Sequence, residues 1–239
     1  MANTGTPGLN GVSLCRRPKA LQRLFFGIED GEVAMQRDDD QDVLETCHGF
    51  VWDEGKFTQI DAPEADITYL HGINNRGQVV GHSRKDIFAL AHGFLWAEGK
   101  FTSLDIPGVL IVGRGTETMG LNDRGQVVGS FQSGGIDRGF LINDSGVTQI
   151  DIGPMGTRAA GINNHGQIVG SFRNAALEER AFLRQADGSF TTIEAPNATR
   201  IGAIGINDGG DVVGLFTLAG GDVHGFLFGP SLRATTSRR

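Results

Sequence analysis

Residues 72–81 read GINNRGQVVG, and this stretch decides the fold because three close copies follow it: GLNDRGQVVG at 120–129, GINNHGQIVG at 161–170 and GINDGGDVVG at 205–214. In each copy, two short apolar runs flank a four-residue link that begins with Asn and ends with Gly. Such a link is typical of a tight hairpin turn in which the Gly takes a positive φ angle. Each copy therefore predicts a pair of antiparallel strands, and we call this ten-residue repeat the first phrase or hairpin phrase.

A second phrase recurs between these copies and is built around a phenylalanine. It reads HGFVW at 48–52, HGFLW at 92–96, RGFLI at 138–142, RAFLR at 180–184 and HGFLF at 224–228. Its phenylalanines stand at positions 50, 94, 140, 182 and 226, so the intervals are 44, 46, 42 and 44 residues. One four-stranded propeller blade takes about 40–45 residues. The spacing therefore predicts a β-propeller.

The two ends of the chain complete the count of blades. GIEDGEVAM at 27–35 is a shorter, degenerate copy of the first phrase, which makes five copies. The last copy lacks a fourth strand, while GVSLCRRP at 11–18 aligns with GKFTSLDIP at 99–107. We therefore expect residues 11–15 to form a strand that closes the last blade and removes an open sheet edge.

This pattern resembles the HAF-type family of probable extracellular repeats, whose copies read roughly His-Ala-Phe followed by Gly-Ile-Asn and Gly-Gln-Val-Val-Gly. The resemblance covers most of the chain, from about residue 11 to residue 228. It implies a propeller-like fold and says little about activity. We predict one all-β domain over residues 1–239, a five-bladed β-propeller with tails at about 1–10 and 230–239.

Composition and charge narrow the functional classes. The formal net charge of −7 argues against a sequence-independent grip on DNA or RNA phosphates, which requires a basic surface. No apolar run reaches the length of a membrane-spanning helix, and the N-terminus lacks the charged-then-apolar order of a signal peptide. We expect a soluble cytoplasmic protein, or a secreted one if a leader has been removed, with no nucleic-acid or membrane partner. Cys15 and Cys47 fit no disulfide framework or metal motif, so we expect free thiols and leave their pairing open.

The repeat also separates structural positions from functional ones. Positions that serve the fold should look alike in every copy, whereas positions that serve one asymmetric site should differ. Three residues before the first Gly of the hairpin phrase, the five copies carry Leu24, Tyr69, Glu117, Arg158 and Gly202. This variation predicts a functional site at the mouth of the propeller channel, where variable segments are held by a rigid scaffold.

Four side chains at this mouth are candidates for chemistry: Tyr69, His71, Glu117 and Arg158. His71 follows Tyr69 by two residues, so both lie on the same side of a strand. A phenol, an imidazole, a carboxylate and a guanidinium suffice for acid–base catalysis or for holding a polar ligand. The alternative is that Glu117 and Arg158 form a structural ion pair that lines a wet channel.

Arginines gather in the predicted connections between blades. A planar guanidinium binds carboxylates and phosphates through two hydrogen bonds at once, so we count Arg23, Arg114 and Arg200 as candidate ligand-binding residues. Some of these arginines should instead pair within the scaffold with acidic residues that recur at one repeat position. The arginines are Arg16, Arg17, Arg23, Arg114, Arg158 and Arg200, and the acidic residues are Asp61, Asp105, Asp151 and Glu194.

Three histidines at equivalent repeat positions could be taken for the ligands of a metal site. His48, His92 and His224 occupy equivalent positions in three copies, but they fall on the third strand of a blade, about 10 Å outside the first. There the side chains diverge, whereas zinc needs ligands at about 2.0–2.1 Å. We therefore expect them to make structural hydrogen bonds and to bind no metal.

One acidic loop is a weak candidate for Mg²⁺. The loop RDDDQD contains Asp38, Asp39 and Asp42, with an aspartate-rich spacing that resembles the diphosphate–metal motif of terpene synthases. Carboxylate oxygens suit Mg²⁺, but the terpene synthase motif lies on a helix and this stretch is a predicted loop. Apart from this alternative we expect no cofactor.

The sequence leaves three functions open. The first is a monomeric or weakly oligomeric protein that binds one small polar or anionic molecule at the axial site. The second is an enzyme (a lyase, isomerase, cyclase or hydrolase) in which Glu117 or His71 is the base, Tyr69 is the acid and Arg158 holds an anionic group. The third is a scaffold for protein interactions.

Overall fold

The computed structural model describes residues 10–16, 28–29, 32–33, 46–53, 56–108 and 114–230, with side chains from residue 46 onward. The chain divides into two compact units, Met1–Asp105 and Ile106–Arg239. Every regular element among the described residues is a β-strand, so the predicted all-β class is confirmed. None of these residues belongs to a helix long and apolar enough to cross a membrane.

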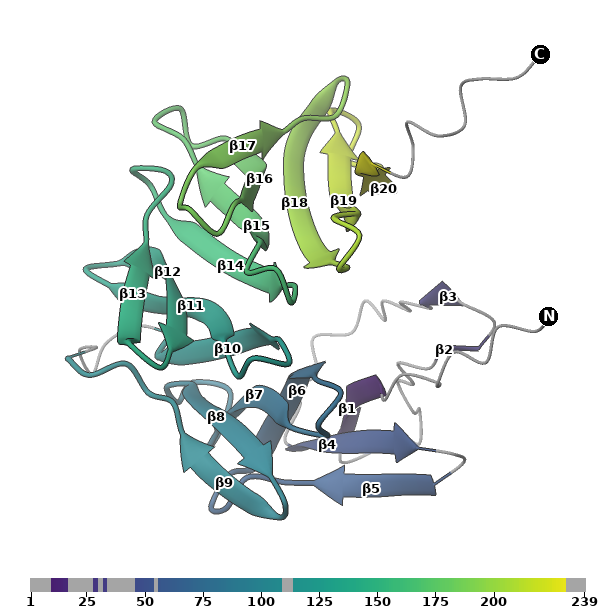
Figure 1. Cartoon of the computed structure of the whole chain (residues 1–239), viewed down its shortest axis with the longest axis vertical. Helices are drawn as coiled ribbons and strands as arrows, with labels where there is room; N and C mark the ends of the chain where they lie inside the picture. The colour runs from purple at the N-terminus through teal and green to yellow at the C-terminus, as the bar shows by residue number, and fades with distance from the viewer. Residues whose placement is uncertain are drawn as a thin grey trace. The chain divides into compact units, whose positions relative to one another are not determined.

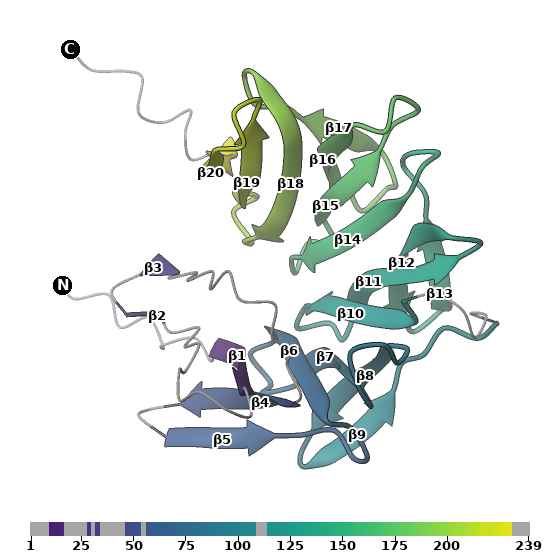
Figure 2. The same ribbon diagram turned by 180° about the vertical axis from the view of Figure 1, so that it is seen from behind.

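Three antiparallel sheets make up the described part of the C-terminal unit, and their strands neighbour one another in chain order (Figures 1 and 2). The first contains β10 (Thr116–Leu121), β11 (Val127–Ser133), β12 (Ile136–Asn143) and β13 (Gly146–Ile150). The second contains β14 (Thr157–Ile162), β15 (Ile168–Arg173), β16 (Glu179–Arg184) and β17 (Phe190–Ile193). The third contains β18 (Ala198–Ile206), β19 (Val212–Leu218) and β20 (Val223–Phe228). Short antiparallel strands in this order are the arrangement of propeller blades.

The N-terminal unit contains one more sheet of the same kind. Its four strands are β6 (Ile67–Ile73), β7 (Val79–Arg84), β8 (His92–Ala97) and β9 (Lys100–Ser103). The hairpin of β4 (Thr46–Asp53) and β5 (Lys56–Ile60) joins this sheet through one parallel pair, Cys47 and Ile67. In the degenerate first copy, the described residues form β2 (Ile28–Glu29) and β3 (Glu32–Val33), which pair with each other.

The N-terminal strand corrects one prediction. Residues 10–16 do form a strand, β1 (Asn10–Arg16), but it pairs antiparallel with β4 and not with β20. Because β3 has only two residues and pairs with β2, β4 would otherwise expose one edge, and β1 satisfies the N–H and C=O groups of that edge. The predicted closure of the last sheet by residues 11–15 is therefore wrong in this structure.

The same pairing corrects the expectation of free thiols. Cys15 lies directly opposite Cys47 in the register of β1 and β4. Cys47 is buried and disulfide-bonded. The expectation of free thiols is therefore wrong in this structure.

Close packing explains why the two repeated phrases always occur together. In each of the four hairpin copies the last Gly of the first phrase is the register partner of the phenylalanine of the second, as in Gly129 and Phe140. A Cβ atom on Gly129 would lie 2.1 Å from the carbonyl oxygen of Glu117 and 2.7 Å from the ring of Phe140. Only glycine fits there, and the ring of Phe140 is fully buried.

The asparagine of the hairpin link holds the turn and also joins neighbouring sheets. In the copy at 161–170, Asn163 Oδ1 accepts hydrogen bonds from the backbone N–H groups of His165 and Gln167 at 3.1 and 3.0 Å. Its Nδ2 donates to the carbonyl oxygen of Asn207 in the next sheet at 3.0 Å. Gly166 closes the turn with a φ angle of +78°, so the predicted tight hairpin is confirmed.

Within the C-terminal unit, apolar packing joins each sheet to the next. Val128 packs against Ala159 and Ile162 of the following sheet, and the equivalent Val169 packs against Ala203; both valines are fully buried. Val213, at the same repeat position in the last sheet, is 49% exposed. Other large apolar side chains exposed on this sheet are Ile204, Leu215, Val223, Leu227 and Phe228.

Candidate functional site

A β-bulge interrupts the first strand of all four described blade-like sheets at the same repeat position. The register skips the residue directly before the first Gly of the hairpin phrase. A bulge re-aims the side chain of the extra residue and is common beside active sites. The bulged residues differ in every sheet: His71, Met119, Ala160 and Ile204.

The register places two further variable positions beside the bulge. The residue three before the Gly lies opposite the residue that follows the last Gly of the phrase. Together with the bulged residue, these two positions form what we call the variable patch of a sheet. The opposed pairs are Tyr69 and His82, Glu117 and Ser130, Arg158 and Ser171, and Gly202 and Leu215.

The variable patch of the β6–β9 sheet consists of three rings in contact: Tyr69, His71 and His82. The Nε2 atom of His71 lies 3.0 Å from the Nδ1 atom of His82. The ring of Tyr69 lies 5.0 Å from that of His82 and 6.2 Å from that of His71, measured between centroids. His82 is buried, whereas His71 is exposed. The patch therefore presents an exposed imidazole supported by a buried one.

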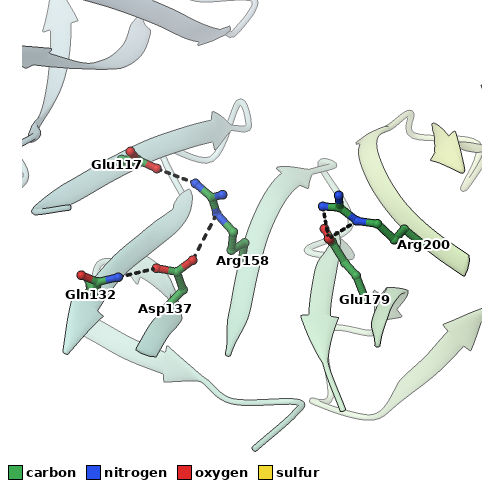
Figure 3. A network of polar contacts seen from close by, with 6 residues as sticks. All are labelled: Glu117, Gln132, Asp137, Arg158, Glu179 and Arg200. Carbon is green, nitrogen blue, oxygen red and sulfur yellow. Dashed lines mark hydrogen bonds and ion pairs between the residues drawn. The ribbon is translucent and has the colours of Figure 1, made fainter. Parts of the chain in front are cut away.

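The C-terminal unit carries an ion-pair network around Arg158 (Figure 3). The Nη2 atom of Arg158 on β14 donates to Oε2 of Glu117 on β10 at 2.7 Å, and its Nε lies 3.8 Å from Oδ2 of Asp137 on β12. Gln132 donates to the other carboxylate oxygen of Asp137 at 3.5 Å. The side chain of Glu117 is only 9% exposed, against 41% for Arg158. The ion pair foreseen as the structural alternative is thus present.

Arg200 is also committed to a carboxylate. Its Nε and Nη2 atoms donate to the same oxygen of Glu179 at 3.2 and 2.8 Å (Figure 3). Glu179 and Asp137 occupy one repeat position, three residues before the phenylalanine of the second phrase. In both cases an arginine on the first strand of one sheet reaches the third strand of the preceding sheet. This recurrence favours a scaffold role for Arg200.

The other predicted ligand-binding residues give no built site. Arg114 is exposed in a bend before β10. The side chain of Arg23 lies outside the described residues, as do those of the weak Mg²⁺ candidates Asp38, Asp39 and Asp42. Over the residues that are described, no group of three or more His, Cys, Asp or Glu side chains is arranged to hold a metal ion.

Two of the three third-strand histidines, His48 and His92, make the structural contacts that were predicted, whereas the ring of His224 lies 5.3 Å from that of Phe216, measured between centroids. The Nδ1 atom of His48 lies 3.0 Å from Asp61 Oδ2, and that of His92 lies 2.8 Å from Asp105 Oδ2. Arg138 replaces the histidine in the next sheet and contacts Asp151 at 3.2 Å.

The recurring aspartates are therefore scaffold residues, as expected, but they pair with the third strand and not with the arginines between blades. The physical reason is the strand register, which brings the end of the fourth strand beside the third strand of the same sheet. Arg180 departs from this pattern because it contacts Glu178 at 2.8 Å, and its sheet has Glu194 at the recurring position.

The four candidate residues are divided between the two units. Tyr69 and His71 belong to the N-terminal unit, and Glu117 and Arg158 belong to the C-terminal unit. Sequence reasoning missed His82, although a signal existed. The residue after the last Gly of the phrase is His82, Ser130, Ser171 or Leu215, so the comparison of copies applied to the second strand would have found it.

Comparisons with known proteins identify no family for the chain. No family model matches it, and no curated protein matches it. Among solved structures, an Aleuria aurantia lectin mutant in complex with Fucα1-6GlcNAc is 13% identical with a TM-score of 0.46, over 77% of this chain and 67% of that one. The same lectin with α-methyl-L-fucoside gives 13% and 0.44, over 77% and 66%. A protein of unknown function from Dyadobacter fermentans gives 14% and 0.49, over 93% and 73%.

Proposed function

We propose that this chain binds a small polar molecule through the variable patches of its sheets. The observation that carries the proposal is the contrast within the repeat: the scaffold positions recur in sheet after sheet, whereas the patch positions do not. The patch of Tyr69, His71 and His82 is the best candidate. Its rings offer flat apolar faces, and its hydroxyl and ring nitrogens offer hydrogen-bond donors and acceptors at their edges.

The charges favour a neutral polar ligand over an anion. Arg158 faces two carboxylates, those of Glu117 and Asp137. Arg200 donates twice to Glu179. A guanidinium already held by a carboxylate would have to give up that bond to hold an anion. Hydroxyl groups, which both donate and accept hydrogen bonds, suit these residues better.

An enzyme that transfers protons is the second candidate function. The contact of 3.0 Å between the imidazoles of His71 and His82 favours it, because a base whose ring is oriented by a second group is a recurring catalytic arrangement. In this reading His71 is the base and Tyr69 the acid for a lyase, isomerase, cyclase or hydrolase. Turnover of a bound ligand would separate an enzyme from a binding protein.

We further propose that the five copies of the repeat form five blades, and that another copy of the repeat covers the exposed apolar face of the last sheet. The support is the exposure of Val213 at a position where Val128 and Val169 are fully buried. Monomeric proteins rarely expose contiguous apolar patches of this kind.

A thermal-shift screen tests the proposed function. The wild-type chain is melted with sugars, polyols, carboxylates and phosphates, because a ligand at 100 times its Kd stabilises the folded state by about 2.7 kcal/mol. We expect a hit that is lost in Tyr69→Phe and His71→Gln. The control variant is His92→Asn, which also removes an exposed imidazole but lies at a scaffold position. A hit that persists in both patch variants would contradict the proposed site.

A further inference from the structure

The two histidines of the patch are joined edge to edge. The distance between their ring centroids is 5.0 Å, which exceeds the distance of 3.0 Å between His71 Nε2 and His82 Nδ1 by only 2.0 Å. The two nitrogens therefore lie close to the line that joins the rings. The planes differ by 23°. This is the geometry of a nitrogen–nitrogen hydrogen bond, which requires one nitrogen to carry a hydrogen and the other to carry none.

We propose that His82 is a positioning residue for His71, and that the two rings change tautomer together. A neutral imidazole carries its hydrogen on one of its two nitrogens. If His71 donates from Nε2, then Nδ1 of His82 is bare and the hydrogen of His82 is on Nε2. If His82 donates from Nδ1, then Nε2 of His71 is bare and the hydrogen of His71 is on Nδ1. Both rings are thus Nε2–H, or both are Nδ1–H.

The difference in burial between the two rings indicates that His82 positions His71, and not the reverse. His82 lies on β7 and is 6% exposed, so its surroundings fix its orientation. His71 is the bulged residue of β6 and is exposed. Among the other described sheets the equivalent pairs are Met119 with Ser130, Ala160 with Ser171 and Ile204 with Leu215, and none of them contains an imidazole. The coupled pair is therefore special to this sheet.

The coupling defines what His71 offers to a ligand, and this step rests on the proposed function. When both rings are Nε2–H, the outer nitrogen of His71, Nδ1, accepts a hydrogen bond. When both are Nδ1–H, the same atom donates one. The shared tautomer therefore decides whether Nδ1 of His71 accepts or donates a hydrogen bond, with no change in net charge. A neutral ligand that carries hydroxyl or carbonyl groups fits this chemistry.

Long-range ¹H–¹⁵N NMR of the imidazole nitrogens tests the coupling without any ligand. At a pH where both rings are neutral, the two nitrogens of each ring report its tautomer. Single His→Asn variants assign the signals of the six histidines. We expect His71 and His82 to show the same tautomer in the wild-type chain. Opposite tautomers, or tautomer ratios that differ between the two rings, would overturn the proposal.

Two substitutions at position 82 distinguish positioning from mere packing. In His82→Phe the ring remains but the nitrogen is lost, so we expect the tautomer ratio of His71 to differ from that of the wild type. In His82→Asn the side-chain amide reaches the place of Nδ1, so one tautomer of His71 should persist. The control His92→Asn should leave His71 unchanged. If His71 behaves identically in His82→Phe and in the wild type, His82 does not position it.

The experiments test the tautomer coupling and the proposed function independently of each other. If His82→Phe does not fold, the wild-type tautomers alone still decide the coupling. If the thermal-shift screen yields no ligand while both rings share one tautomer, the coupling stands and the proposed function falls.

Discussion

Replacing Val213 by alanine tests whether the apolar face of the β18–β20 sheet is covered by another copy of the repeat. Val128, Val169 and Val213 occupy one repeat position, and their exposures are 0%, 0% and 49%. The change from valine to alanine removes two carbon atoms, at about 0.8 kcal/mol for each buried CH₂ group. At Val128 or Val169 the loss is therefore about 1.6 kcal/mol, and a residual cavity adds to it.

At Val213 the expected loss of unfolding free energy depends on whether the side chain stays half exposed or is covered by another copy of the repeat. If the side chain stays half exposed, the loss is about half as large, about 0.8 kcal/mol, with no cavity term. If another copy covers it, the loss equals that at Val169. Urea unfolding followed by circular dichroism gives the three free-energy differences. We predict equal losses for Val169→Ala and Val213→Ala, and a loss at Val213 of half that at Val169 or less would refute the five-bladed arrangement.

Three further predictions follow from the scaffold and the ion pair. Arg158→Ala should lower the free energy of unfolding by about 1–3 kcal/mol, because it leaves the buried carboxylate of Glu117 without this partner; combining it with Glu117→Gln in a double-mutant cycle should recover part of that loss, and strict additivity of the two changes would contradict the pairing. Gly129→Ala should cost about 1–3 kcal/mol or prevent folding, since the added Cβ meets backbone and the Phe140 ring; a melting temperature equal to that of wild type would count against this packing. Thiol titration of the unfolded, unreduced chain should find no free thiol, because Cys47 is disulfide-bonded; two reactive thiols per chain would contradict the pairing.

The fold could be predicted in its repeated parts because each of them is local. A hairpin link such as NNHG specifies its turn through one asparagine side chain and one positive-φ glycine, and both are visible in the sequence. The pairing of Gly129 with Phe140 follows from the constant spacing of the two phrases. Strand length and spacing therefore lead directly to four-stranded sheets in chain order.

The partner of β1 could not be predicted, because the alternation of apolar and polar residues predicts a strand but does not specify the strand with which it pairs. A strand that suits one sheet edge by length and pattern suits another edge of the same length, and the register is set by contacts distant in sequence. The alignment of residues 11–18 with a fourth strand predicted that a strand forms there, but not which strand it pairs with. The sequence did not show that an edge of β4 would be available to β1. This availability arises because β3 is much shorter than the other second strands.

The candidate site was predictable where it varies between copies. Comparing one repeat position found Tyr69, Glu117 and Arg158, and alternation added His71. It could not show that Asp137 also faces Arg158, since that contact depends on how two sheets pack. It missed His82 because the second strand was not compared, although the β6–β7 register places His82 directly opposite Tyr69.

Mapping a bound ligand by NMR tests whether the patch of Tyr69, His71 and His82 is the binding site. A compound that stabilises the wild-type chain is titrated into ¹⁵N-labelled protein, and changes in the backbone amide shifts are followed. The account predicts that the largest changes fall on β6 and β7, around Tyr69, His71 and His82, and that they disappear in His71→Gln. Largest changes elsewhere, for example on the exposed face of the β18–β20 sheet, would contradict it.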